Sequence, residues 1–546
     1  MSYFNPQGNF NSLLKEGFKH YKGTQETVVR NIEAINDMSS MTRTAYGPNG
    51  MNKYIINQHN KLFLTKDTKV MGDELDINHP AVNMLIGASK AQDKEVGDGT
   101  NFVITFGGEL MNLAGKLYDS GVHISDITLG YEKGFNKAME ILENAEKVEI
   151  KDISNIEEAT KIIKPVIGSK MVHGQENFLA PLIAQACINV LPSNDPTKFN
   201  EDNVRVAKIL GGSLMKTSVM KGLVVVRNVE GSITKSEKCN VAVYNCPFET
   251  QGAETNDQVV FKSADELLNY TKGEEEHMEK IVKNIVDAGI NVAVIGGNVS
   301  NMAIHYFDKY GVMVFRVMSK FELRRIANSV GAKLLVRLGP PTKEEMGTAD
   351  EIKVTEISSQ KCIVVLKESE NNKLSTLVLR GTTKDMLDNM ERIIYDGVNA
   401  YKVGCKHCQY VAGAGAIEMH LSNEIQKFSK NFETLDRYGI EAFAEAFEVV
   451  PRTLLENSGF NINECMATLR SKNNTDGKMG VNIKNGECED GFKLGVYDNL
   501  ETKKWAIKYA YSTAVTILKI NQLIIAKPAG GPGFKKPPGA NEQDEF

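Results

Sequence analysis

The chain has 546 residues, of which 42% are hydrophobic and 24% are charged, close to the average for globular proteins. This length predicts about three domains, because a single hydrophobic core stops growing well before such a size. Lys and Arg total 64 and Asp and Glu total 69, giving a net charge of −5. This charge argues against a protein that functions mainly by binding nucleic-acid phosphates.

Several features predict a cytoplasmic protein that contacts no membrane. No stretch reaches the roughly 18 apolar residues that a membrane helix needs. The first residues, MSYFNPQGNFNSLLKEG, have no basic segment followed by an apolar one, so we expect no secretory signal. The eight cysteines are mostly scattered singly, which is typical of reduced thiols.

The first section of the chain is predicted to be helical. Apolar residues recur every three or four positions from Val28 to Met38, and Gly47-Pro48-Asn49-Gly50 ends the pattern. We then expect two strands over 53–57 and 62–65 that could form a hairpin, and helices over 80–96 and from 102 through 117. The loop Gly97-Asp98-Gly99-Thr100 therefore lies at a helix amino terminus.

The middle of the chain alternates between strands and helices from about Gly222. The expected strands are 223–227, 241–245, 290–295 and 312–317, and helices are expected to begin at Ser263, Ser300 and Ser319. Ser263 with Glu266, and Ser319 with Glu322, match the capping box that satisfies amides at a helix start. The alternation predicts an α/β module with at least one βαβ unit.

Long helical patterns return from about Thr382. They cover 386–403, a region near 432–457 and a region near 501–525, with a Gly-rich break at 413–415. Residues 527–546 are rich in Pro and Gly and poor in apolar groups, so they are predicted to form a flexible tail.

Three Gly-rich loops, at 47–50, 97–100 and 413–415, lie in these outer helical sections. Unobstructed amides at a helix amino terminus attract anions, so phosphate is the natural ligand, although no Walker motif is present. Asp67, Asp98 and Asp396 lie close to the loops or in the helices, and Mg²⁺ prefers one or two carboxylates plus substrate phosphates. Each loop taken alone is also compatible with a plain turn.

Taken in order, these segments resemble the ATPase signature of group II chaperonins over essentially the whole chain. The matching residues are Thr44 to Lys53, Thr65-Lys66-Asp67, Gly97-Asp98-Gly99-Thr100-Asn101, Asp396, the loop at 413–415 and Asp498. Asn101, Cys246-Pro247-Phe248 and residues 526–532 further resemble one subunit type of the eukaryotic cytosolic chaperonin, TRiC or CCT.

The resemblance implies an α/β multidomain chaperonin fold with discontinuous domains. A mostly helical equatorial domain would comprise 1–145 and 402–546, and a small α/β intermediate domain would comprise 146–212 and 370–401. An apical α/β domain with a helical protrusion would occupy 213–369, where helix 319–330 and the strand edge 217–222 match substrate-facing elements.

The resemblance also assigns roles to residues of an ATP site. Residues that would contact the nucleotide are Tyr46, Gly47, Pro48, Gly99, Thr100, Asn101, Phe102, Ser169, Lys170, Gly413, Gly415 and Asp498. Among these, Lys170 would sense the γ-phosphate and Asp498 would bind the ribose hydroxyls. Asp98 would bind Mg²⁺, and Asp396 would activate the attacking water with support from Asp67.

The function implied is that of a subunit of a hetero-oligomeric double-ring chaperonin that hydrolyses ATP to ADP. Its partners would be other chaperonin subunits and unfolded clients such as actin and tubulin. Three departures from the family pattern leave a second hypothesis open. Thr68-Lys69-Val70 follows Thr-x-Asp where the family has Gly-Ala-Thr, which places a long cationic side chain near the expected site. Ala414 replaces a Gly, and Asn499 replaces a Pro. Under that hypothesis the chain is a structural ring subunit that binds nucleotide but hydrolyses it weakly. A metabolic ATP enzyme such as a small-molecule kinase is a third possibility, but no acceptor-site motif supports it.

Overall fold

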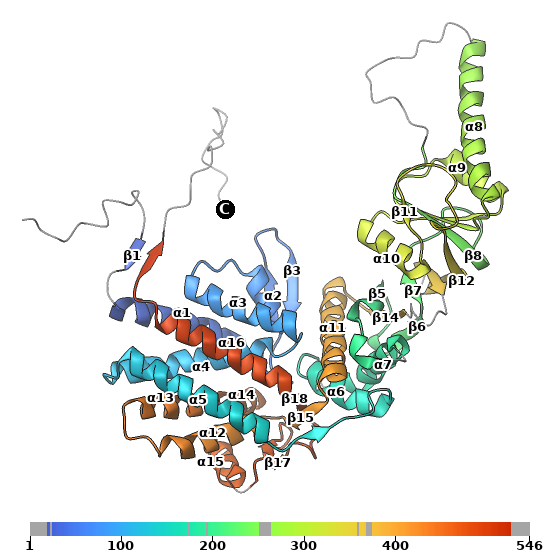
Figure 1. The fold of residues 1–546 in the computed structure, drawn as a ribbon. Coiled ribbons are helices and arrows are strands. Elements are labelled where there is room, and N and C mark those ends of the chain that lie inside the picture. The colour runs from blue at the N-terminus through green and yellow to red at the C-terminus, as the bar shows by residue number, and fades with distance from the viewer. Residues whose placement is uncertain are drawn as a thin grey trace, which may run out of the picture.

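The computed structural model describes residues 19–21, 24–171, 174–192, 195–249, 264–357, 360–366, 374–474 and 476–525. The chain runs from a helical region through a smaller mixed region into a region built on a sheet, and then returns by the same route (Figure 1). The three regions are arranged one after another along an arc (Figure 1). Within the described residues, no helix combines the length and the hydropathy that crossing a bilayer would require.

The helical region is built from two distant parts of the chain. The first part supplies α1 (Thr24–Arg43), α3 (Pro80–Glu95), α4 (Thr100–Asp119) and α5 (Ile124–Asn144). The second supplies α12 (Ala416–Ser429), α13 (Asp436–Ala446), α14 (Val449–Ser458), α15 (Ile462–Asn473) and α16 (Leu500–Leu518). Both parts share one hydrophobic core, in which the rings of Phe106 and Phe447 stack with centroids 4.5 Å apart.

Short strands join these helices and place two loops of interest. Strands β2 (Lys53–Ile56) and β3 (Leu62–Thr65) form the expected antiparallel hairpin, and α2 (Thr68–Glu74) follows it. β15 (Gln409–Ala412) lies between β4 (Val148–Glu149) and β18 (Tyr497–Asn499), with Val411 opposite Asp498. β16 (Met479–Val481) pairs with β17 (Cys488–Asp490), and β1 (Lys19–Tyr21) pairs with β19 (Leu523–Ile525).

The mixed region is also built from two separate stretches. Helices α6 (Ile156–Gly168), α7 (Glu176–Val190) and α11 (Lys384–Lys406) pack beside a sheet of β5 (Val204–Leu210), β14 (Ser375–Gly381) and β6 (Ser218–Lys221). β14 is the central strand, parallel to β5 and antiparallel to β6. One core joins the helices to this sheet, so α6 and α11 are held in one packed unit.

The sheet region contains the expected βαβ units. Its strands are β7 (Leu223–Val225), β8 (Lys235–Tyr244), β9 (Val292–Ile295), β10 (Met313–Arg316), β11 (Leu334–Leu335), β12 (Gly347–Ile357) and β13 (Gln360–Leu366), and its helices are α8 (Ala264–Asp287), α9 (Asn301–Lys309) and α10 (Lys320–Val330). β8, β9 and β10 run parallel, and α8 projects away from the sheet (Figure 1). Val292 and Val294 enter one core while Ala293 and Ile295 enter another, as expected for a strand covered on both faces.

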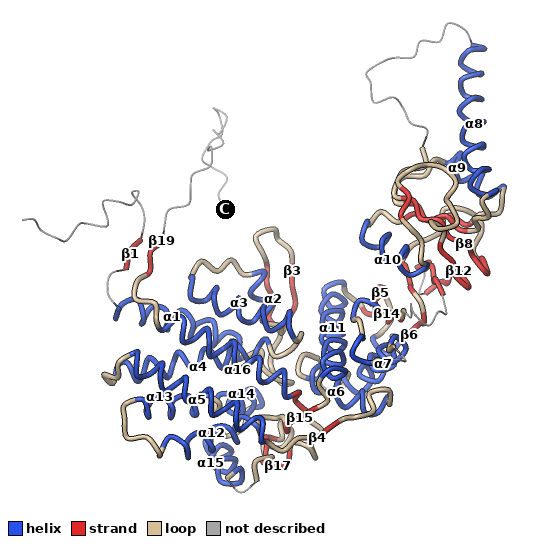
Figure 2. The backbone as a smooth tube through the Cα atoms, in the orientation of Figure 1, coloured by secondary structure: helices blue, strands red, loops and turns tan. Residues whose placement is uncertain are grey.

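Several element boundaries differ from the sequence predictions. The pattern near 432–457 forms two helices, because the chain bends at Phe447 and Glu448 between α13 and α14. The pattern near 501–525 ends as a helix at Leu518 and continues into β19, whose pairing with β1 no local periodicity reveals. Ser300 and Ser319 cap α9 and α10 as predicted, whereas Ser263 and the tail 527–546 lie outside the described residues. Strands are short in the helical region and concentrate in the sheet region (Figure 2).

Candidate functional site

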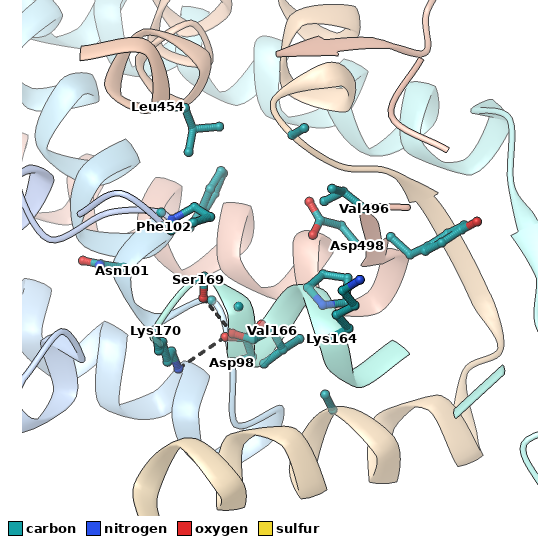
Figure 3. Close-up of a pocket in the computed structure, with 18 of the residues that line it drawn as sticks. Asp98, Asn101, Phe102, Lys164, Val166, Ser169, Lys170, Leu454, Val496 and Asp498 are labelled. Carbon is teal, nitrogen blue, oxygen red and sulfur yellow. Dashed lines mark hydrogen bonds and ion pairs between the residues drawn. The ribbon is translucent and has the colours of Figure 1, made fainter. Parts of the chain in front are cut away.

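A cavity of about 630 Å³ lies where the helical region meets α6 of the mixed region. Its wall combines the segments after α1 and β3, the start of α4, the end of α6, and the segments that flank α12 and α16. Side chains from these distant segments face one another across the cavity (Figure 3). Its volume lies within the range of roughly 300–1,000 Å³ that is usual for small-molecule sites.

The amino end of α4 is exposed to this cavity. Gly99 is its N-cap residue with a φ of +81°, and no side chain caps the helix. Gly97 also has a positive φ, +79°, and a Cβ there would lie 2.5 Å from the Cβ of Asn399 on α11. The Oδ1 atom of Asn101 is buried and has no hydrogen-bond partner in the described residues. The helix start therefore offers free amides and positive potential to an anion.

The loop after α1 forms a second wall. Gly47 has a φ of +77°, and a Cβ there would lie 2.6 Å from Leu454. The side chain of Asn457 donates hydrogen bonds to the carbonyls of Arg43 at 2.9 Å and Tyr46 at 2.8 Å, which fixes the loop against α14. Burial raises the pKa of Tyr46, so its hydroxyl stays protonated and is a donor or acceptor toward the cavity.

Asp67 is held at the start of α2, next to the start of α4. Its Oδ1 accepts from the amide of Lys69 at 3.2 Å and from the hydroxyl of Thr100 at 2.9 Å. The Lys69 ammonium lies 2.5 Å from the carboxylate of Asp93 on α3, and Lys69 is not among the residues that line the cavity. The sequence predicts a long cation near the site, but the charge of Lys69 is directed toward Asp93.

A cluster of two carboxylates and a lysine joins the helical and mixed regions. The Nζ atom of Lys170, just after α6, lies 2.7 Å from Oδ2 of Asp396 on α11 and 3.6 Å from Oδ1 of Asp98. Burial raises the pKa of Asp396 to about 7, although the attraction of Lys170 opposes the shift. Burial alone would lower the pKa of Lys170, but Asp396, Asp98 and Asp67 raise it, so this lysine is charged.

A second charged cluster lies at the start of α16. The ammonium of Lys503 lies 3.0 Å from Oδ2 of Asp498 and 2.5 Å from Oε1 of the buried Glu418, and 4.9 Å from the ring centre of Phe102. Burial opposes its charge, but Asp498 and Glu418 raise the pKa of Lys503 well above its usual value. Asn499 accepts from the amides of Glu501 at 3.0 Å and Thr502 at 3.3 Å, so the residue that replaces the family's proline caps α16.

The Gly-rich break at 413–415 forms the turn between β15 and α12. A Cβ on Gly413 would lie 3.1 Å from the Asp498 carboxylate, and one on Gly415 would lie 2.9 Å from Pro451. Gly415 has a φ of +79°, and Ala414 has a φ of +56°, a conformation that a side chain disfavours. The alanine that replaces a family glycine therefore occupies a backbone geometry suited to glycine.

Replacing Ala414 with Gly is expected to raise the free energy of unfolding by about 0.5–1 kcal/mol. The substitution relieves about 1–2 kcal/mol of backbone strain. This gain exceeds the loss of stability that glycine causes by raising the conformational entropy of the unfolded chain. Thermal unfolding of the full chain measures the change. Ala416→Gly, at the first residue of the following helix α12, is the control and should lower stability. A loss of stability in both variants would contradict the strain at Ala414.

Most of the predicted site residues meet at the cavity. Those that line it are Tyr46, Gly47, Pro48, Asp67, Asp98, Gly99, Thr100, Asn101, Phe102, Ser169, Lys170, Gly415 and Asp498. Asp396 and Gly413 do not line it, but Asp396 pairs with Lys170 and Gly413 packs against Asp498. Lys66, Glu418 and Lys503 were not predicted as site residues. Of the three, only Glu418 had a signal in the sequence, as an acidic residue between apolar ones in the first turn of a helix.

The residues present fit a nucleotide with Mg²⁺. The uncapped amino end of α4 provides amide donors for phosphate oxygens. The unpartnered Oδ1 atom of Asn101 is an acceptor, which a water molecule of the bound nucleotide's hydration shell can satisfy. No group of three or more His, Cys, Asp or Glu side chains in the described residues could hold a metal by itself. A single wall carboxylate such as Asp98 is what Mg²⁺ needs when substrate phosphates complete its coordination.

Comparison with known proteins supplies the family. Residues 38–528 match the model of the TCP-1/cpn60 chaperonin family. The chain is 43% identical over 539 residues to the T-complex protein 1 subunit theta of Homo sapiens, covering 98% of this chain and 97% of the relative. It is 42% identical to the subunit theta of Dictyostelium discoideum (97% of this chain, 98% of the relative) and to that of Arabidopsis thaliana (95% of each). The chain therefore belongs to the TCP-1/cpn60 chaperonin family.

Proposed function

We propose that this chain is a subunit of a hetero-oligomeric double-ring chaperonin that uses ATP to enclose and fold cytosolic proteins, with actin and tubulin among its clients. The observation that supports this most is the convergence of Asp98, Lys170 and Asp396 from three separate segments beside one cavity. The similarity to T-complex protein 1 subunit theta over nearly the whole chain supports the ring assembly.

The nucleotide is proposed to bind with its phosphates at the amino end of α4. The amides and hydroxyl of residues 99–102 would donate to phosphate oxygens, and the loop Tyr46-Gly47-Pro48 would cover the other side. Asp498 lies on the opposite wall beside the turn 413–415, where its carboxylate would accept from ribose hydroxyls. Ser169, which donates to the carbonyl of Val166 at 2.7 Å, holds the chain after α6 at the cavity wall.

Asp396 is the proposed general base, and Lys170 is proposed to control when it is available. Bound at Asp98, Mg²⁺ would neutralise charge on the phosphates. Lys170 neutralises Asp396 in the structure described here, and a γ-phosphate would compete for its ammonium. Once Lys170 shifts toward the phosphate, Asp396 would be available to orient a water and accept its proton, while Asp67 keeps Thr100 in place.

We propose the domain division that the sequence predicted: an equatorial domain at 1–145 and 402–546, an intermediate domain at 146–212 and 370–401, and an apical domain at 213–369. The separate cores of the helical, mixed and sheet regions support a division into three domains. β6 pairs with β14 in the sheet of the mixed region, so we assign residues 218–221 to the intermediate domain and not to the apical one. Because Lys170 and Asp396 belong to the mixed region while Asp98 belongs to the helical region, a rotation of one against the other would assemble or disperse the site.

The rate of ATP hydrolysis is expected to fall as the pH drops through about 7. A general base must be deprotonated, and the pKa of Asp396 is raised to about 7 by burial, so acid removes the active form well above the ~4 of an exposed aspartate. A single-turnover rate profile between pH 5 and 9 would measure it. A rate that stays flat down to about pH 5 would contradict Asp396 as the base.

The proposed function is tested by assembly and turnover together. Native mass measurement of the chain purified from its own cells should show a large complex with other chaperonin subunits, and that complex should refold a denatured client only with hydrolysable ATP. A monomer or dimer of this chain alone would contradict the ring subunit. An assembled complex whose ATP turnover is unchanged by Asp396→Ala in this chain would instead favour the weakly hydrolysing structural subunit.

A further inference from the structure

Gln92 is a fully buried glutamine in the last turn of α3 that none of the assigned roles uses. Its Nε2 atom donates to the carbonyl of Asp98 at 3.0 Å and to the carbonyl of Thr502 at 3.2 Å. A side-chain amide nitrogen carries two hydrogens, so these contacts use both of them. Asp98 and Thr502 come from the two distant parts of the helical region, and one side chain therefore joins them beside the cavity.

The backbone of Gln92 also holds the loop that carries Asp98. Its carbonyl accepts from the amides of Val96 at 3.0 Å and Gly97 at 3.4 Å, just before the Asp98 carbonyl that the side chain holds. Gly99 then packs against the side-chain amide, because a Cβ there would lie 3.2 Å from Nε2. The path of the loop from 96 to 99 is therefore set by contacts with this one glutamine.

The contact with Thr502 anchors this loop to the start of α16. Thr502 lies in the first turn of the helix, where the side chain of Asn499 accepts from its amide at 3.3 Å. The helix is itself fixed in the shared hydrophobic core through Ala506 and Ile507. Gln92 does not line the cavity, so it acts on a bound nucleotide only through the segments that it holds.

We propose that Gln92 is a positioning residue, whose amide braces the 97–100 loop against α16 and so fixes the place of the Asp98 carboxylate for Mg²⁺. The proposal rests on the proposed nucleotide site and deepens it. Loss of a group that holds a metal ligand in place typically reduces metal affinity or activity by roughly 10–100-fold. The competing explanation is a purely structural role, in which Gln92 satisfies two buried carbonyls and affects only stability.

Two substitutions in the full chain separate these explanations. Gln92→Met keeps the length of the side chain and removes both donors, whereas Gln92→Asn keeps an amide that is one methylene too short to reach both carbonyls. Gln426→Met is the matched control, because the Gln426 amide donates at 3.4 Å to the hydroxyl of Ser422 within the same helix, α12.

Three measurements are made on each chain. Calorimetry gives the dissociation constant of ADP with Mg²⁺ and with EDTA in its place, and the ratio of the two constants is the contribution of Mg²⁺ to binding. Hydrogen exchange of the nucleotide-free chain follows the amides of residues 97–102, and thermal unfolding gives the melting temperature.

A positioning role predicts a specific loss of the Mg²⁺ contribution. The ratio of the ADP dissociation constants should fall roughly 10–100-fold in Gln92→Met, and Gln92→Asn should lie between this variant and the unaltered chain. Amides of 97–102 should exchange faster in both Gln92 variants, because the loop has lost its bond at Asp98. Gln426→Met should match the unaltered chain in both measurements. Both Gln92 variants should also melt at a lower temperature, a change that the competing explanation shares.

A lowered melting temperature of Gln92→Met with an unaltered Mg²⁺ contribution would establish the purely structural role, and so would failure of both Gln92 variants to fold. If Gln92→Met alone does not fold, Gln92→Asn decides by the same comparison. If the unaltered chain binds ADP no more tightly with Mg²⁺ than with EDTA, the proposed metal site fails and the assignment falls with it. A Mg²⁺ contribution that is present in the unaltered chain and equal in both variants removes the Gln92 assignment alone.

Discussion

Replacing Asp396 with Asn is expected to lower the single-turnover rate of ATP hydrolysis by roughly 10²–10⁴-fold, the usual contribution of a general base. Asparagine keeps the size of the side chain but accepts no proton. Asp396 does not line the cavity, and its ion-pair partner Lys170 lies between it and the cavity. The dissociation constant of Mg-ATP should therefore change by no more than about threefold. Rapid-quench measurement of the rate and calorimetry of binding together separate chemistry from affinity.

The matched control lies on the same helix. Asp388 also pairs with a lysine, Lys208, at 2.5 Å, but on a surface away from the cavity. Asp388→Asn should hydrolyse ATP at the unaltered rate. Equal rates for Asp396→Asn and the unaltered chain, or equal losses in both variants, would remove Asp396 from the reaction.

Replacing Asp98 with Asn is expected to reduce hydrolysis by roughly 10²–10³-fold and to raise the Mg²⁺ concentration needed for half-maximal activity. Asp98 supplies the carboxylate in the cavity that is closest along the chain to the start of α4, and Mg²⁺ needs such a ligand in addition to phosphate oxygens. The substitution also removes one of the two carboxylates near Lys170, so the Lys170 ammonium would be drawn further toward Asp396. A Mg²⁺ titration at fixed ATP measures both effects.

Asp93→Asn is the comparison for this prediction. Asp93 lies on α3, one turn before the loop that holds Asp98, and pairs with Lys69 outside the cavity. Its loss should alter neither the rate nor the Mg²⁺ requirement. An Asp98→Asn variant with a normal Mg²⁺ titration would show that the metal is held elsewhere.

Local signals in the sequence were sufficient for the elements that build the phosphate loops. The hairpin of β2 and β3, the start of α3 at Pro80 and the start of α4 after Gly99 all follow from short-range patterns of apolar residues, Pro and Gly. The same is true of the Ser caps on α9 and α10. These features depend on neighbours within a few residues, so they can be predicted without knowledge of the tertiary fold.

The grouping of the site residues came from the resemblance and not from periodicity. Asp98 and Asp396 are almost 300 positions apart, and only the packing of α11 against α6 brings Lys170 within 2.7 Å of Asp396. Lys66 and Lys503 were missed for the same reason. A lysine in a sequence does not reveal whether its ammonium is exposed, paired with a buried Glu418, or left without a carboxylate in a cavity wall.

The departures from the family pattern also needed the structure. Lys69 suggested a cation in the active site, but a 2.5 Å ion pair directs it to Asp93. Asn499 provides a helix cap in place of a proline, and Ala414 keeps a glycine-like φ of +56°. Of the three, only Ala414 leaves a strained backbone beside the cavity, and this strain affects stability more directly than chemistry.

The most direct test of the account is a structure of the full chain, within its assembly, bound to Mg²⁺ and a non-hydrolysable ATP analogue. We expect phosphates at the amino end of α4, Mg²⁺ in contact with Asp98, the ribose at Asp498, and the Lys170 ammonium drawn from Asp396 toward the terminal phosphate. Nucleotide bound at any other cavity, or phosphates in this cavity that contact neither the start of α4 nor Asp98, would contradict it.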